Sequence, residues 1–227
     1  MRSAALESRL AEVDGSIADA ASSVGRDPSE ITRIVVTKFH PAALVRDLYA
    51  LGVRNVAENR QQEFQAKRDE LTDLDDLRWH FVGQVQSKKA RAVRRAADVV
   101  HSVDRDKLVA ALDASGEGPL DVLVQINLTD DPNRGGVRDG DAPRLAEAIV
   151  RSSSLRLRGV MAVAPLDEDP GRAFERLAGI SACVRTVAPD ARWISAGMSG
   201  DFAEAIAHGA THLRIGTAIT GNRPPAP

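Results

Sequence analysis

The sequence predicts an α/β fold: a single (β/α)8 barrel of the TIM type, with an extra helix at its N-terminus. The chain has 227 residues, within the range of roughly 200–250 residues typical of one such barrel. Short apolar runs alternate with longer amphipathic segments along almost the whole chain, which is the pattern of repeated strand–helix units. No long linker interrupts this pattern, so residues 1–227 are expected to form one domain.

The first predicted element is a helix that precedes the barrel. Apolar side chains recur at three- and four-residue steps at Leu6, Leu10, Val13, Ile17 and Ala21. This spacing places them on one face of an amphipathic helix. A glycine and a proline, Gly25 and Pro28, then end the helix.

Eight strands are expected next, and several are apolar throughout, as in parallel strands that are covered on both faces. They are residues 31–37, 55–57, 79–82, 99–102, 122–127, 157–161, 193–195 and 212–215. The expected helices between them are residues 41–51, 60–71, 88–97, 107–115, 142–152, 171–187 and 201–208. An open doubly wound sheet is the alternative, but no GxGxxG fingerprint follows the first strand.

Charge and hydropathy indicate a cytoplasmic protein that binds neither nucleic acid nor membranes. The net charge of −2 gives no overall attraction to polyanions. The basic residues between 88 and 95 are expected to form a solvated helix face, and no stacking aromatics interleave with them. No apolar stretch approaches the roughly 20 residues that cross a bilayer, and no signal-peptide core is expected at the N-terminus.

The single cysteine, Cys183, excludes an internal disulfide and is expected to be a small core residue. No set of histidine, cysteine and carboxylate side chains has metal-ligand spacing, so no metal site is expected. A monomer is expected because no large apolar stripe stands out.

Lys38 directly follows the first apolar run, Ile34-Val35-Val36-Thr37. In a parallel barrel the chemistry gathers where the strands end. A lysine there would be partly desolvated, and desolvation favours the neutral amine that attacks an aldehyde. The alternative is an ordinary solvated lysine at the end of a strand.

The other end of the chain resembles a phosphate site. Gly197, Ser199 and Gly200 lie between a strand and a helix, and Gly216 and Thr217 follow the last strand. Small residues let backbone N–H groups approach an anion, and many barrels bind phosphate with the loops after strands seven and eight. Ser199 and Thr217 could instead be helix N-caps, which use the same N–H groups.

Arg214 lies two residues before Gly216, on the same face of the last strand. Burying an arginine inside a barrel is unfavourable unless it has partners, so the alternative to a ligand is a salt bridge with a carboxylate. Met161 and Met198 are expected to pack near the pocket.

Seven segments in a fixed order carry a family resemblance. They are VVTK (35–38), AENRQQE (57–63), WHFVGQVQSKK (79–89), HSVD (101–104), GVM (159–161), GMSGDF (197–202) and RIGT (214–217). With these segments the chain resembles the pyridoxal phosphate homeostasis proteins over nearly its whole length. The resemblance implies a barrel related to the N-terminal domain of alanine racemase.

The resemblance also implies pyridoxal 5′-phosphate (PLP) bound as a Schiff base to Lys38. The phosphate would lie on Ser199, Gly216 and Thr217, and Arg214 would face the pyridine nitrogen. An arginine there would keep that nitrogen unprotonated and weaken the ring as an electron sink.

Asn59, His80 and Met198 match motif positions that the resemblance places among the cofactor-binding residues. For Asn59 and His80, a buried structural hydrogen bond is the alternative to ligand contact.

The resemblance implies a protein that stores PLP and delivers it to apo-enzymes, without catalytic turnover. The alternative is an amino-acid racemase, which needs a second acid/base on the opposite face of its substrate. Alanine racemases take a tyrosine for this role from an added C-terminal domain, whereas the one tyrosine here, Tyr49, lies on a predicted helix. A third possibility, a phosphosugar isomerase or aldolase, would use Lys38 and the phosphate loops without a cofactor.

Overall fold

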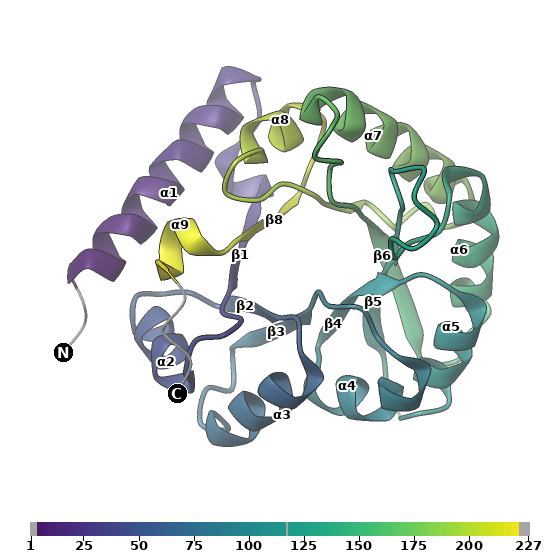
Figure 1. The fold of residues 1–227 in the computed structure, drawn as a ribbon, viewed down its shortest axis with the longest axis horizontal. Helices are drawn as coiled ribbons and strands as arrows, with labels where there is room; N and C mark the ends of the chain where they lie inside the picture. Colours follow the sequence, from purple (N-terminus) through teal and green to yellow (C-terminus); the bar gives the residue numbers. More distant parts are fainter. Residues whose placement is uncertain (1–3, 117, 223–227) are drawn as a thin grey trace.

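Eight parallel strands close into a barrel in the computed structural model, which describes residues 4–116 and 118–222. Each strand pairs with its neighbour in sequence, and β8 pairs with β1 (Figure 1). The strands are β1 (Thr32–Val36), β2 (Asn55–Glu58), β3 (Arg78–Phe81), β4 (Val99–Val103), β5 (Leu120–Gln125), β6 (Leu155–Met161), β7 (Trp193–Ser195) and β8 (His212–Ile215). The predicted barrel is therefore confirmed, and the open-sheet alternative is wrong.

Helices surround the strands on the outside of the barrel (Figure 1). They are α1 (Ala4–Ser23), α2 (Ala42–Ala50), α3 (Gln61–Glu70), α4 (Ala90–Ala96), α5 (Asp106–Asp113), α6 (Ala142–Val150), α7 (Pro170–Val187), α8 (Phe202–Ala207) and α9 (Thr217–Thr220). The sequence did not predict α9, whose four residues follow β8 directly. Residues 1–3, 117 and 223–227 of the predicted domain lie outside the described part of the chain.

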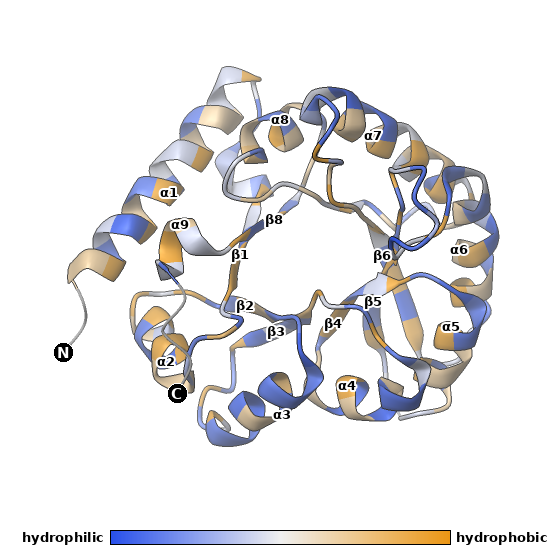
Figure 2. Cartoon of the chain, viewed as in Figure 1, coloured by the Kyte–Doolittle hydropathy of each residue, from blue (hydrophilic) through white to orange (hydrophobic). Residues whose placement is uncertain are grey.

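The main hydrophobic core lies between the strands and the helices. All five apolar residues that predicted the N-terminal helix are buried on α1, which packs against α8 and α9. Figure 2 shows the hydrophobic positions gathered on the strands and on the helix faces that meet them. A small cluster, Val99, Leu123 and Met161, is separate from this main core, and polar side chains such as His80, His101 and Arg214 are buried as well.

Ion pairs close the N-terminal end of the barrel. The carboxylate of Asp121, which is 2% exposed, accepts hydrogen bonds from Arg78 and from Arg156, each at 2.5 Å. The strand predicted at 122–127 therefore begins earlier, at Leu120. A buried charge can stand within a strand when it is paired, and a pattern of apolar residues does not register such a pair.

Two expectations about side-chain burial are wrong. Cys183 is exposed on α7, because it lies on the solvent side between the buried Ile180 and Val184. Arg94, in the basic segment expected to be solvated, is 8% exposed, and its guanidinium donates to the carbonyl of Gly118 at 2.6 Å.

Gly159 occupies a point of close backbone approach between β6 and β7. Its φ is +153°, and a Cβ added there would lie 1.8 Å from the carbonyl oxygen of Trp193. No side chain fits at that distance, which explains why glycine stands inside this strand.

We predict that Gly159→Ala lowers the free energy of unfolding by about 3 kcal/mol or more, because the β6–β7 backbones must move apart. Gly179→Ala on α7 is the matched control, since a Cβ added there would have no atom within 4 Å. In a helix interior that change should stabilise by about 0.5–1 kcal/mol. Urea unfolding followed by circular dichroism measures both, and equal effects of the two changes would contradict the argument.

Candidate functional site

Lys38 lies in a turn immediately after β1, at the end of the barrel where all the strands terminate. Thr37 before it is fully buried, whereas Lys38 itself is exposed. The expectation that Lys38 is partly desolvated is therefore wrong for this structure. Its amine is open to a ligand that approaches the mouth of the barrel.

The loop after β7 turns back on itself at Gly197. The φ of Gly197 is +89°, and a Cβ there would lie 2.8 Å from the Cβ of Ala205 on α8. The N–H of Met198 donates to the Asp201 carboxylate at 2.6 Å, which closes the turn. Only glycine allows this conformation without strain.

Unused N–H groups line this mouth. In the described part of the chain, the backbone N–H groups of Ser199, Gly200 and Thr217 donate to no protein acceptor. The loops that carry them are neighbours, because β7 pairs with β8 and the N–H of Arg214 donates to the carbonyl of Gly197 at 2.9 Å. Neighbouring N–H groups without acceptors suit an anion such as a phosphate.

Arg214 lies inside the barrel, 5% exposed. Its guanidinium donates to the Ser195 hydroxyl at 2.7 Å and to the Ala162 carbonyl at 2.8 Å. Among the described residues it forms no ion pair, so the predicted alternative of a carboxylate partner is wrong. Burial lowers the pKa of Arg214 to about 10, so it stays protonated at neutral pH.

A chain of hydrogen bonds extends from Arg214 across the barrel. Ser195 Oγ lies 2.9 Å from His101 Nδ1, and His101 Nε2 lies 2.9 Å from His80 Nδ1. His80 Nε2 in turn lies 3.0 Å from Asn55 Oδ1. Because Ser195 accepts from Arg214, its own proton goes to His101, and each ring then donates to the next acceptor along the chain.

The two histidines in this series of hydrogen bonds, His80 and His101, are uncharged at neutral pH. Burial lowers the pKa of His80 and of His101 well below the usual value. At the N-terminal end of the barrel, burial also lowers the pKa of His212 to about 3. Arg214 thus carries the positive charge of this hydrogen-bonded series, in which the histidine, serine and asparagine side chains are neutral.

The remaining predicted site residues differ in their surroundings. Both ring nitrogens of His80 are bonded to protein, which favours the buried hydrogen-bond alternative. Asn59 follows β2 and lines a cavity of about 340 Å³, and its buried Oδ1 has no partner among the described residues. Met161 packs inside the barrel as expected, but Met198 is 38% exposed, so packing is the wrong role for it.

Sequence reasoning assigned no role to five residues that prove central to the geometry. They are Glu58, Glu63, Lys67, His101 and Ser195. The sequence pattern could have indicated two of them, Lys67 and His101. Lys67 falls in line with the buried Phe64 and Leu71 on the apolar face of its helix, and His101 interrupts an apolar strand.

Neither a metal cluster nor a membrane span occurs in the described ranges 4–116 and 118–222. No group of three or more histidine, cysteine or carboxylate side chains there could hold a metal ion. No helix there is long and apolar enough to cross a membrane.

Comparison with known proteins identifies the family. The family model of the alanine racemase N-terminal domain matches residues 30–224. The pyridoxal phosphate homeostasis protein of Mycobacterium tuberculosis is 40% identical, over 98% of this chain and 94% of its own. This chain belongs to the pyridoxal phosphate homeostasis protein family. The family that the seven segments indicated is thus confirmed.

Solved structures extend the comparison. PipY of Synechococcus elongatus, a structure with PLP bound, is 36% identical with a TM-score of 0.80, over 90% of this chain and all of PipY (100%). The alanine racemase of Corynebacterium glutamicum is 14% identical with a TM-score of 0.68, over 94% of this chain and 62% of the racemase. At that identity the racemase shows a shared fold alone.

We predict that the protein loses stability as the pH falls from 7 to 5. His80, His101 and His212 are neutral when folded but take up protons near pH 6.5 when unfolded. Because their folded pKa values are lowered, the stability they contribute is complete above pH 6.5 and is lost below it. Each of these histidines changes the free energy of unfolding by up to about 1.4 kcal/mol per pH unit, so the three together contribute up to roughly 4 kcal/mol per pH unit.

Chemical denaturation at several pH values measures this slope. Below about pH 5 ordinary carboxylates begin to contribute, and the buried Glu58, whose pKa is raised by burial, contributes with the opposite sign, so the histidine contribution is isolated by comparing wild type with a histidine variant. His212→Gln should reduce the dependence of the unfolding free energy on pH by up to about 1.4 kcal/mol per pH unit, the contribution of one histidine. An equal pH dependence in wild type and in His212→Gln would mean that burial does not lower the pKa of His212 in the folded protein.

Proposed function

We propose that this protein binds PLP reversibly as a Schiff base on Lys38, and thereby holds and releases the cofactor inside the cell. The observation that carries the proposal is the shared location of two kinds of group. An exposed lysine amine and a set of unused N–H groups lie at one mouth of the barrel. PLP carries an aldehyde and a phosphate, and its aldehyde reacts with an amine.

Phosphate binding is assigned to the loops after β7 and β8. Ser199, Gly216 and Thr217 would hold the phosphate with backbone N–H groups and the two hydroxyls. β1 pairs with both β2 and β8, so Lys38 emerges beside the strand that Gly216 follows. The lysine and the phosphate loops are therefore neighbours although they lie at opposite ends of the sequence.

Arg214 is assigned to the pyridine nitrogen. A protonated guanidinium can only donate, so the nitrogen that faces it must accept and stay unprotonated. When bound, PLP supplies an aldehyde and an aromatic ring that can withdraw electrons, and an unprotonated ring does this weakly. Arg214 therefore favours holding the cofactor over using it.

The remaining site residues support the same proposal. Asn59 offers a free Oδ1 as an acceptor, and Met198 lies exposed on the phosphate loop as part of the rim. His80 acts indirectly, by holding His101 and, through it, Ser195 and Arg214.

We propose that the protein has no catalytic turnover of its own. Its relatives are named as homeostasis proteins. The Tyr49 hydroxyl donates to Asp76, which precedes β3 at the barrel end opposite Lys38. Tyr49 is therefore in no position to act as the second acid/base of a racemase. The family assignment likewise disfavours a cofactor-free isomerase or aldolase.

Delivery of the cofactor to apo-enzymes by a cytoplasmic monomer is also part of the proposal. The exposed position of Lys38 supports it, because a receiving protein or free amine could reach the attachment point without a rearrangement of the barrel.

Mixing the protein with PLP should produce the near-ultraviolet and visible absorbance of a lysine Schiff base. Borohydride should then fix the cofactor on the peptide that contains Lys38. Lys38→Ala should abolish both signals, whereas the exposed Lys88→Ala should leave them unchanged. A protein that stays colourless, or an adduct on another lysine, would refute the proposal.

The PLP-loaded protein should not racemise alanine at an enzyme-like rate, taken as about 1 s⁻¹ or more. Chiral chromatography of the product measures the rate. Racemisation at that rate, lost in Lys38→Ala, would establish the racemase alternative instead.

A further inference from the structure

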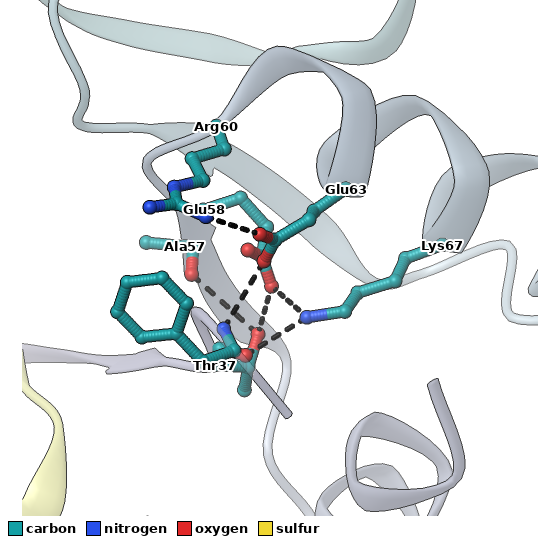
Figure 3. A network of polar contacts seen from close by, with 7 residues as sticks. Thr37, Ala57, Glu58, Arg60, Glu63 and Lys67 are labelled. Carbon is teal, nitrogen blue, oxygen red and sulfur yellow. Dashed lines mark hydrogen bonds and ion pairs between the residues drawn. The ribbon is translucent and has the colours of Figure 1, made fainter. Parts of the chain in front are cut away.

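A buried polar network holds the residue before Lys38 (Figure 3). The Lys67 ammonium on α3 donates to the carbonyl oxygen of Thr37 at 2.8 Å and to Glu58 Oε1 at 2.5 Å. The Thr37 hydroxyl donates to the same Glu58 oxygen at 2.6 Å. Thr37 and Glu58 are fully buried and Lys67 is 6% exposed, so water does not compete for these bonds.

A second group of contacts holds the residue after Lys38. The N–H of Phe39 donates to Glu63 Oε2 at 3.1 Å, and Arg60 pairs with the other oxygen of Glu63 at 3.3 Å. The Arg60 guanidinium also lies 4.7 Å from the centre of the Phe39 ring. Phe39 has a φ of +67°, a conformation that non-glycine residues adopt only where their surroundings impose it.

One short segment supplies all of these contacts. Glu58 ends β2, Glu63 is in the first turn of α3, and Lys67 is one turn further along the same helix face. Their side chains converge on the turn after β1, as Figure 3 shows. The backbone is thus fixed on both sides of Lys38, while the Lys38 side chain is exposed.

If Glu58 and Lys67 served packing alone, a buried ion pair would bring no gain in stability over apolar side chains. Burial raises the pKa of Glu58, although Lys67 and the Thr37 hydroxyl partly offset that effect. Its second oxygen has no partner among the described residues. Apolar side chains of similar volume would often be as stable in such a place. They would not, however, bind the carbonyl that directly precedes Lys38.

We propose that Glu58, Lys67 and Glu63 are positioning residues that hold the Lys38 amine in the orientation in which it attacks the aldehyde of PLP. The inference rests on the proposed function. With Thr37 and Phe39 anchored, Lys38 retains only its own side-chain torsions, and such preorganisation accelerates a reaction between held groups. Lys67 is itself buried and ion-paired, so it holds the turn and leaves the reaction to Lys38.

Two independent changes test this inference. Glu58→Leu with Lys67→Met removes the buried pair together and leaves no lone charge behind. Glu63→Ala removes the acceptor of the Phe39 N–H, and it affects a side chain that is 31% exposed, so the fold is retained. Glu63→Gln keeps an oxygen at that position and is the rescue variant.

Arg94→Met is the matched control. Arg94 is also a buried cation that donates to backbone carbonyls, those of Gly118 and Ser154. These residues precede β5 and β6 at the opposite end of the barrel. Its removal should lower the melting temperature without affecting Lys38.

Two measurements are compared at equal temperature. Borohydride quenching with peptide mass spectrometry gives the rate of adduct formation on Lys38. Hydrogen–deuterium exchange gives the protection of the Phe39 amide. The double variant and Glu63→Ala should form the adduct about tenfold more slowly than wild type and should exchange the Phe39 amide faster. Glu63→Gln and Arg94→Met should match wild type in both measurements.

The outcomes separate the two proposals. If wild type forms no adduct on Lys38, the proposed function fails. Unchanged Phe39 exchange in Glu63→Ala would show in any case that Glu63 does not hold the turn. The positioning inference is overturned if wild type forms the adduct and the variants form it at the same rate although their Phe39 amide exchanges faster. Should the double variant not fold, Glu63→Ala and Glu63→Gln decide the matter.

Discussion

The need to satisfy a buried guanidinium organises the interior of this barrel. Arg214 on β8 finds neutral acceptors in the Ser195 hydroxyl at the end of β7 and the Ala162 carbonyl just after β6. Ser195 then requires an acceptor for its own proton, and His101 and His80 continue the chain to Asn55 at the start of β2. The interior is therefore specified by hydrogen bonds, whereas the apolar core that stabilises the fold lies outside the strands.

The mouth of the barrel is built from two separately anchored halves. The β2–α3 segment fixes the turn that carries Lys38, and the β7–β8 pairing fixes the loops with unused N–H groups. Closure of the barrel between β1 and β8 brings these halves together. A site that draws on both ends of the chain thus forms only when the last strand has joined the first.

Strand order and the residues at strand ends could be predicted from the sequence, because parallel strands produce apolar runs with polar residues after them. Lys38 and Gly216 were found in this way. Contacts between distant polar residues could not be predicted. Asp121 lies in a strand because arginines from two other strands pair with it, and Lys67 is buried because Glu58 and a carbonyl receive it. Exposure at the ends of loops, as for Met198, likewise depends on the tertiary structure.

The exposure of Lys38 has a consequence for how long a cofactor would remain attached. An amine in open contact with solvent gives water the same access to the carbon–nitrogen double bond that the aldehyde used to form it. Under the proposed function, attachment and hydrolysis would then share one route. The occupied fraction would follow the free cofactor concentration closely, which is how a buffer behaves.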